Sequence, residues 1–302
     1  MEDKNFTHPK IKGIPHKTML TEGTALVLEG GGTRGFYTAG VFDAFIDAGI
    51  MFPYITGVSA GAANVLTYVA GQKGRTRQII KHYVGDKRYV SKRNILRNKS
   101  LFGYDFIFRT VPKKHIFWDS EIFENTNIRL LTGATDCATG EPFWFEKSDL
   151  APEFMPTIAS CSVPLLSQMV KIGDRKFLDG GLSAPIPIEK SVADGNNFHV
   201  IVLTRNEGYV QEAFRYKRIA NLFYRKHPRL VDAILNRHEI YNRQLKLCEQ
   251  LEHDKKAIII RPQIPLTVGR ATSDTAKLLA LYDEGHTEGA QAVQLISALL
   301  NT

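Results

Sequence analysis

Cysteine is scarce in this chain of 302 residues, which contains only three. Cys137, Cys161 and Cys248 lie far apart and form no C-x-x-C pair. This spacing argues against a disulfide framework and against a zinc site, and a reducing compartment suits it best. We therefore expect the protein in the cytoplasm. The sequence also holds no cluster of acidic residues suited to calcium, and we expect neither a metal nor another cofactor.

Long apolar stretches are missing as well. No window approaches the roughly 18 uninterrupted apolar residues that a membrane-spanning helix requires. The first residues are polar, are interrupted by Pro9, Gly13 and Pro15, and contain no apolar core of a signal peptide. We expect residues 1–23 to form an N-terminal tail without an export signal.

Acidic residues are in the minority. The chain has 39 Lys and Arg against 31 Asp and Glu, a net charge of +8 and a pI of about 9.3. This balance indicates an anionic partner, either nucleic acid or an anionic membrane, although a basic surface also serves solubility. Two basic segments, 72–118 and 214–230, are rich in aromatic residues. They are typical of a lid or a surface that touches lipid head groups, and equally of solvated helix faces with a few core aromatics.

The apolar pattern predicts an α/β fold. Short apolar runs at 25–28 and 53–56 are each followed by a glycine-containing turn and a helical pattern, over 36–47 and from residue 62. This strand–helix–strand–helix order is typical of a parallel sheet. Further strands are predicted at 199–204 and 257–260, and hairpins over 128–145 and 169–178. The remaining C-terminal sequence predicts a helix over 214–230 and two helices separated near Gly285.

The turn after the second predicted strand reads Gly57-Val58-Ser59-Ala60-Gly61, a G-x-S-x-G pattern. In this setting a tight turn presents the serine hydroxyl at its tip, and the two glycines avoid clashes with the flanking strand and helix. The helix N-terminus at that place favours developing negative charge. Ser59 is thus a candidate nucleophile, provided that the chain also supplies an oxyanion hole and a base.

A glycine-rich loop, residues 30–35, follows the first predicted strand. It satisfies the dinucleotide-binding pattern G-x-G-x-x-G, but that function needs an acidic residue near the end of the next strand, and residues 51–58 contain none. The alternative is an oxyanion hole, because successive glycines leave backbone N–H groups open to a substrate. Adjacent parallel strands end at one edge of a sheet, which brings this loop next to Ser59 and favours acyl transfer.

Two kinds of base are compatible with Ser59. A histidine would complete a Ser–Asp–His triad, although none lies in a convincing site loop. The other candidate is Asp179, which ends a predicted hairpin and is followed by Gly180 and Gly181 in a tight turn, as an ordinary hairpin aspartate would be. To act as a base, this carboxylate needs a pKa that partial desolvation raises. Five histidines follow Asp179 in the chain: His199, His227, His238, His253 and His286.

Together, the three motifs and their order resemble the patatin-like phospholipase family, in particular its bacterial-type members. The family pattern is a G-x-G-x-x-G loop, a G-x-S-x-G turn and a D-G-[AG] turn, which stand here at 30–35, 57–61 and 179–181. The segment from Ala159 to Pro164 also resembles the family's A-S-x-x-x-P segment. The resemblance covers about residues 24–193, and Glu29 departs from the aspartate that many members have there.

The resemblance implies a three-layer α/β/α fold with a mainly parallel central sheet over residues 24–193, followed by a mostly helical extension with a strand over 194–302. By position, it implies Ser59 as the nucleophile and Asp179 as the proton acceptor. Arg34 is expected to hold the glycine loop rather than to meet substrate. The oxyanion hole is expected within that loop: Gly30, Gly31, Gly32, Thr33, Arg34 and Gly35.

The resemblance further implies a serine esterase that cleaves acyl lipids, of phospholipase A or lysophospholipase type, through a Ser59 acyl-enzyme. Its expected partners are the acyl lipid substrate and, by peripheral contact at the inner membrane face, an anionic membrane; no nucleic acid is expected. An acyltransferase with the same two residues and a membrane-binding module with a vestigial site are the alternatives. No motif assigns an oligomeric state.

Overall fold

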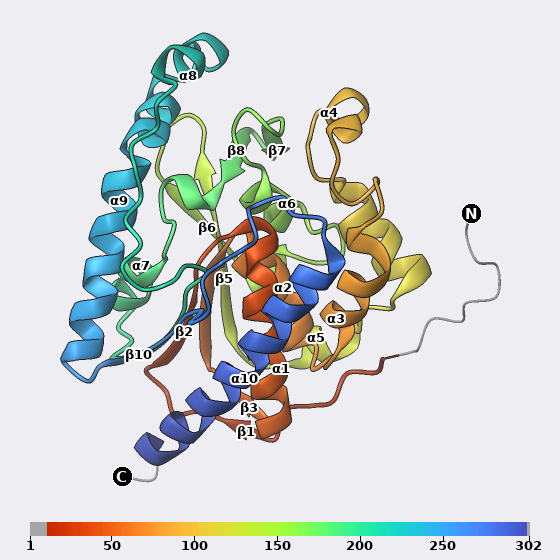
Figure 1. Cartoon of the computed structure of the whole chain (residues 1–302). Helices are drawn as coiled ribbons and strands as arrows, with labels where there is room; N and C mark the ends of the chain where they lie inside the picture. The colour runs from red at the N-terminus through yellow and green to blue at the C-terminus, as the bar shows by residue number, and fades with distance from the viewer. Residues whose placement is uncertain (1–10, 301–302) are drawn as a thin grey trace.

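A computed structural model describes residues 11–300, in which one sheet lies between two layers of helices (Figure 1). Within this range eight strands form the sheet, in the order β10-β9-β2-β4-β5-β8-β7, with β6 paired to β5. The first five of these are parallel, and β6, β7 and β8 join through antiparallel pairs. The predicted α/β class and mainly parallel sheet are therefore confirmed. The strands are β2 (Thr24–Leu28), β4 (Tyr54–Val58), β5 (Arg129–Asp136), β6 (Pro142–Glu146), β7 (Val170–Ile172), β8 (Arg175–Asp179), β9 (Phe198–Val202) and β10 (Ala257–Ile260).

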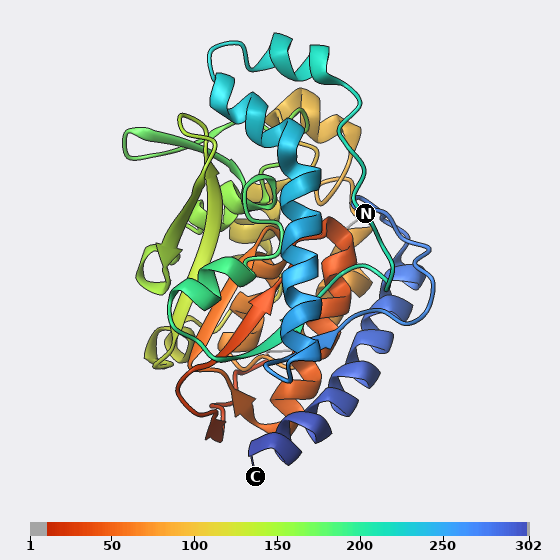
Figure 2. The same cartoon turned by 90° about the vertical axis from the view of Figure 1, so that its left-hand side faces the viewer.

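Helices cover both faces of the sheet. Helices α1, α2 and α10 lie on one face, and α7 and α9 lie on the other (Figures 1 and 2). The α-helices are α1 (Phe36–Ala48), α2 (Ala60–Val69), α3 (Arg75–Ile79), α4 (Lys92–Asn98), α5 (Ser120–Asn125), α6 (Met155–Cys161), α7 (Ile188–Ala193), α8 (Lys217–Phe223), α9 (Pro228–His253) and α10 (Thr275–Leu300). The 3-10 and π segments are η1 (Gly32–Gly35), η2 (Ile80–Val84), η3 (Phe106–His115), η4 (Lys147–Asp149) and η5 (Gly180–Leu182).

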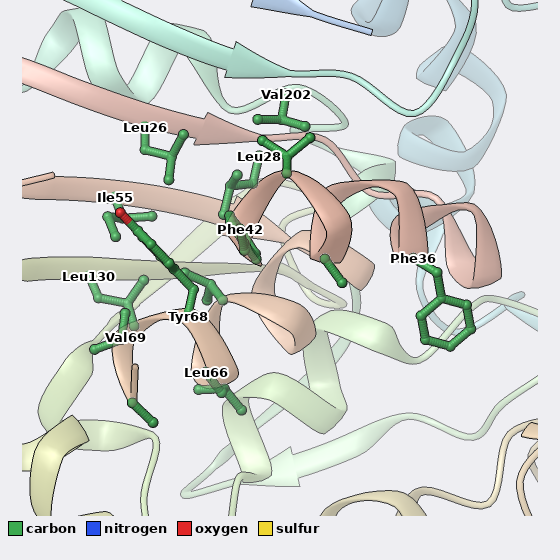
Figure 3. Close-up of a cluster of buried hydrophobic side chains, with 14 of the residues drawn as sticks. Leu26, Leu28, Phe36, Phe42, Ile55, Leu66, Tyr68, Val69, Leu130 and Val202 are labelled. Carbon is green, nitrogen blue, oxygen red and sulfur yellow. The ribbon is translucent and has the colours of Figure 1, made fainter. Parts of the chain in front are cut away.

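Strand β2 shows why a continuous apolar run belongs at the centre of this sheet. All five of its residues are buried, because helices cover both of its faces. Side chains alternate between the faces of a strand. Leu26 and Leu28 belong to the cluster beneath α1 and α2, together with Phe42 and Tyr68 (Figure 3), whereas Val27 packs toward α9. The core thus fixes both helical layers around β2 and β4, the two strands that carry the glycine loop and the serine turn.

The C-terminal extension joins the same sheet. Strand β9 pairs with β2, β10 pairs with β9, and α10 packs along α1. The prediction of two helices separated near Gly285 is wrong, because α10 runs through this glycine without a break. A Cβ atom on Gly285 would lie 2.1 Å from the carbonyl oxygen of Tyr37 in α1, and one on Gly40 would lie 2.0 Å from that of Tyr282. Gly285 therefore marks a close helix contact and not a helix end.

Two further segments differ from their predicted form. The helix predicted over 214–230 is two helices, since α8 ends before Pro228, which begins α9 and has no N–H for a continuous helix. Part of the predicted tail is anchored, because a short strand β1 (Thr18–Met19) pairs with β3 (Ile50–Met51). Residues 1–10 of that tail lie outside the described range. The segment 72–118 places most of its aromatic side chains in the core: Tyr83, Tyr89, Phe106, Phe108 and Trp118.

Candidate active site

Ser59 lies at the tip of a sharp turn between β4 and α2. Its φ of 52° and ψ of −121° fall in a region that non-glycine residues rarely adopt, as the serine pattern requires. Room for this turn comes from Gly61, where a Cβ atom would lie 2.8 Å from Cβ of Leu28 and 2.9 Å from the Glu29 carbonyl oxygen. Gly57 faces the turn from the strand side. The turn is thus strained at Ser59 and permitted by its glycine neighbours.

Sheet register brings Asp179 to Ser59. Val58 is paired with Gly133 of β5, and the next residue of β5, Ala134, is paired with Asp179 at the end of β8. The Ser59 hydroxyl donates a hydrogen bond of 2.8 Å to Asp179 Oδ2, although 120 residues separate the two in the chain. Both side chains are buried, with 7% exposure each.

The turn after Asp179 holds its carboxylate. The Gly181 N–H donates to Asp179 Oδ1 over 2.7 Å, and the following segment, η5, begins at Gly180. Burial raises the pKa of Asp179 above its ordinary value. Two hydrogen bonds, from Gly181 and Ser59, act in the opposite direction and lower that pKa. The positive charges of Arg237 and Arg270 also lower it, so the upward shift is smaller than burial alone would cause. An aspartate that acts as a base requires a shift in this upward direction.

The backbone of Ser59 is held by a side chain that the sequence analysis did not assign. The Ser59 N–H donates to Ser160 Oγ over 2.7 Å, and the Ser160 hydroxyl donates to the Gly133 carbonyl over 2.6 Å. Ser160 belongs to the A-S-x-x-x-P segment at the end of α6 and is fully buried. This buried chain of hydrogen bonds connects the serine turn to strand β5 and fixes the turn relative to Asp179.

The glycine loop between β2 and α1 lies beside Ser59. A Cβ atom on Gly30 would lie 3.1 Å from Ser59 Cβ. The Gly30 N–H has a partner in Pro185 O, and the Thr33 and Arg34 N–H groups donate to Arg270 O and Gly31 O. Within residues 11–300, the N–H groups of Gly31 and Gly32 have no hydrogen-bond partner. These two groups are therefore the ones open to an anionic oxygen.

Two contacts from the C-terminal extension fix the shape of this loop. The buried Arg34 side chain donates from Nε to the carbonyl oxygen of Thr204, at the end of β9, over 3.1 Å. This contact links the glycine loop to the segment after β9, and Arg34 also lines the cleft that contains Ser59. The Thr33 hydroxyl donates to Gly269 O over 3.0 Å and accepts the Thr272 N–H over 3.1 Å. We name residues 268–272 the clasp loop, which packs on the glycine loop and which the sequence analysis did not identify.

The five histidines occupy different places. His199 is buried in β9, where burial lowers its pKa to about 4 and its Nδ1 lies 3.1 Å from Ser191 Oγ. His227 precedes α9, His253 ends it, and the His286 ring meets Asp47. Only His238, on α9, lines the same cleft as Ser59, and its Nδ1 lies 2.9 Å from Leu235 O. The Ser59 hydroxyl donates its hydrogen bond to a carboxylate and not to an imidazole.

Two cavities meet at Ser59. The larger is a cleft of about 420 Å³, whose lining includes the glycine loop, Asp179 and the cationic side chains of Arg215, Arg237 and Arg270. The smaller, of about 80 Å³, also reaches Ser59 and is lined mainly by aromatic and aliphatic residues: Phe36, Ala60, Ala63, Tyr89, Phe102, Tyr104, Ile107, Phe108 and Val163. Both cavities are therefore lined largely by apolar residues, and the larger one also contains arginine side chains.

Residues 11–300 contain no group of three or more His, Cys, Asp or Glu side chains arranged to hold a metal ion. In the same range, no helix combines the length and the apolar character needed to cross a bilayer. The three cysteines are free, and Cys137 and Cys248 are buried.

Comparisons with known proteins cover two parts of the chain. The family model for the patatin-like phospholipase matches residues 26–191, and a model described as a domain of unknown function (DUF6363) matches residues 227–301. The uncharacterized protein YjjU of Escherichia coli (strain K12) is 28% identical over 194 residues, which are 60% of this chain and 51% of that protein. This chain thus spans about half the length of that curated relative.

Among solved structures, VipD from Legionella pneumophila is similar with a TM-score of 0.45 and 15% identity, over 97% of this chain and 72% of VipD. The patatin-like match extends over more than half of the 302 residues and contains all three motifs at the site. This chain belongs to the patatin-like phospholipase family.

Proposed function

We propose that this protein is a lipid acyl hydrolase that cleaves carboxylic esters through an acyl-enzyme on Ser59, with Asp179 as the base. The observation that carries the proposal is the 2.8 Å hydrogen bond between these two side chains, at a place where a cleft that contains arginines meets an apolar pocket. A nucleophile needs a base within hydrogen-bond reach, and Asp179 meets this criterion. Its raised pKa makes it a stronger base than an exposed aspartate.

The reaction follows from these contacts in two steps. Ser59 Oγ attacks the ester carbonyl as Asp179 accepts the hydroxyl proton, and the N–H groups of Gly31 and Gly32 stabilise the oxyanion. When the tetrahedral intermediate collapses, the proton passes from Asp179 to the departing alcohol. Water then attacks the acyl-enzyme, gives its proton to Asp179, and the fatty acid leaves as Ser59 recovers its own proton.

The two cavities at Ser59 support an amphiphilic substrate. An ester at Ser59 could direct its acyl chain into the apolar pocket and its polar alcohol part into the cleft, where Arg215, Arg237 and Arg270 lie. Cationic side chains favour an anionic head group, as in a phospholipid or lysophospholipid. An apolar pocket with few polar groups is the usual environment of an acyl chain.

Two experiments test this proposal. A fluorophosphonate probe should label the wild type and not Ser59→Ala, while Ser148→Ala, which changes an exposed serine far along the chain, should keep full labelling. A mixed panel of phospholipids and lysophospholipids, read by mass spectrometry, should then yield free fatty acid with the wild type alone. Labelling of Ser59→Ala at the wild-type rate would contradict the assignment of Ser59 as the nucleophile. Acyl transfer to added alcohols without fatty acid release would favour an acyltransferase, and a protein with neither activity would fit a vestigial site.

A further inference from the structure

Two short helices, α4 and α8, stand at the same end of the molecule (Figures 1 and 2). Each continues directly from a wall of the cleft. Leu101 and Phe102 line the cleft just after α4, and Phe214 and Tyr216 line it just before α8. Both helices are therefore joined directly to segments that line the cleft at Ser59.

Both helices carry positive charge without any negative charge. We name residues 92–99 and 217–226 the basic rim; these stretches contain eight exposed Lys and Arg residues and no Asp or Glu. Within the part of the chain that the structure describes, none of the eight forms an ion pair, and the neighbouring pair is Arg215 with Glu212. The eight cations are Lys92, Arg93, Arg97, Lys99, Lys217, Arg218, Arg225 and Lys226.

Large apolar side chains project from the same two helices. Leu96 on α4 is 88% exposed, and Leu222 and Phe223 on α8 are 70% and 68% exposed. The other side of α8 is anchored, because Tyr224, just after it, is buried and its hydroxyl accepts the Leu165 N–H over 2.8 Å. The exposed side chains are thus the outward face of a fixed helix. Exposed apolar residues that cluster in this way mark an interaction surface.

We propose that the basic rim docks on an anionic lipid bilayer, with Leu96, Leu222 and Phe223 entering the region between head groups and acyl chains. Apolar side chains among unpaired cations are the pattern of helices that lie in a membrane interface. The charge complements anionic head groups, and the residues project from protruding helices and not from a groove that would receive a peptide. The choice of a lipid partner rests on the proposed function, since docking here would set the cleft against its substrate.

The test measures vesicle binding in the absence of hydrolysis. Ser59→Ala protein is mixed with sedimentable vesicles of phosphatidylcholine alone or of phosphatidylcholine with phosphatidylglycerol, at low and at high salt. We expect binding to the anionic vesicles that salt weakens, because each basic residue near such a surface adds attraction. Since no catalysis is needed, this readout is independent of the role of Ser59. Absence of binding to anionic vesicles would overturn the proposal even if the hydrolase activity is established.

Variants then locate the contact. In the Ser59→Ala background, Leu222→Ser with Phe223→Ser should lower the vesicle partition coefficient about tenfold or more, since the variant no longer buries these two apolar side chains in the bilayer. Lys217→Gln with Arg218→Gln should lower it similarly and reduce the salt dependence. The matched control is Leu295→Ser, which changes a leucine of 57% exposure on α10, away from the rim. Thermal melts verify folding. Equal binding by the control and both rim variants, or binding instead to a soluble acidic protein alone, would overturn the bilayer assignment.

Discussion

The guanidinium Nε of Arg237 donates a hydrogen bond of 2.6 Å to the carbonyl oxygen of Gly181, two residues beyond Asp179. Its Nη1 donates to Gln211 Oε1 over 2.8 Å, so the side chain is held at both ends of the guanidinium. Arg237 lies on α9, inside the segment that matches a domain of unknown function. That segment also contributes the clasp loop on the other side of the site. It therefore contacts both the glycine loop and the turn that carries Asp179.

Replacing Arg237 should separate its charge from its hydrogen bonds. Arg237→Met removes a positive charge near Asp179 and leaves the Gly181 carbonyl oxygen without this donor, a cost of about 1–3 kcal/mol, whereas Gln211 Oε1 still accepts the Tyr209 hydroxyl. We expect a kcat at least about tenfold lower and an acid limb of kcat/KM at higher pH, because the lost charge had favoured the carboxylate. Arg237→Lys keeps the charge, so its acid limb should stay near that of the wild type. A Met variant with lower activity but an unchanged pH profile would reduce Arg237 to a purely structural role.

The raised pKa of Asp179 predicts the pH dependence of the wild type. A base must be ionised, so kcat/KM on a water-soluble ester should fall as pH drops through a pKa above the ordinary value of about 3.9. An acid limb of kcat/KM whose pKa is at or below this ordinary value would contradict a buried aspartate base. The measurement is a pH–rate profile on enzyme shown to remain folded across the range.

The same shift makes a prediction about stability. Because the folded-state pKa of Asp179 is above its unfolded value, its contribution to stability is full below about pH 3.9 and is lost as pH rises through the folded pKa. Asp179→Asn should therefore melt at a higher temperature than the wild type near pH 7, with a smaller difference near pH 4. Melting curves at both pH values test this. A variant less stable than the wild type at pH 7 would show that hydrogen bonds to the carboxylate outweigh its desolvation.

Asp179→Asn and His238→Gln together identify the base. His238 is the histidine that lines the cleft, yet the Ser59 hydroxyl donates to Asp179. We expect Asp179→Asn to lose about a thousandfold in kcat, within the range that a positioned general base contributes, and His238→Gln to keep most of the activity. Steady-state rates on one soluble ester compare the two variants. The reverse pattern, an inactive His238→Gln beside an active Asp179→Asn, would restore a histidine mechanism.

Phe108 should limit the length of the acyl chain. It is 7% exposed and lines both the apolar pocket at Ser59 and an adjoining cavity of about 70 Å³, which also contains Phe36 and Ile107. Phe108→Leu should join these spaces and raise the ratio of kcat/KM for long to short acyl esters by about tenfold, the value of roughly two added methylenes. Phe143→Leu, on β6 and outside both cavities, is the control. An equal change in both variants would argue against an acyl chain in this pocket.

The sequence predicts the fold of this site well where the evidence is local. Apolar runs followed by glycines predict β2 and β4, and parallel strands end at one edge, so Ser59 and the glycine loop were expected to be neighbours. The pairing of Ser59 with Asp179 depends on the register of β5 and β8. The sequence predicts this pairing only through the family resemblance, because the motif order alone does not give the register.

The residues that sequence reasoning missed act through distant contacts. Arg237 stands in a helical pattern like many surface arginines, and nothing near it in sequence indicates that α9 directs it to Gly181. The clasp loop likewise contacts Thr33 across more than 230 residues. Gly285 has an ambiguous local signal, because a glycine that ends a helix and one that lets two helices touch look alike until the partner helix is known.

Gly285→Ala tests this close helix contact. Alanine normally stabilises a helix interior by about 1 kcal/mol over glycine, but here its Cβ would lie 2.1 Å from the Tyr37 carbonyl oxygen, so α1 or α10 must move. We expect a net loss of about 2 kcal/mol in the free energy of unfolding, measured by denaturant titration. Gly85→Ala is the control, since its nearest atom, Thr275 Oγ1, would be 3.6 Å away. Because α1 follows the glycine loop directly, the Gly285 variant should also lose esterase activity, and a stable, fully active variant would refute the contact.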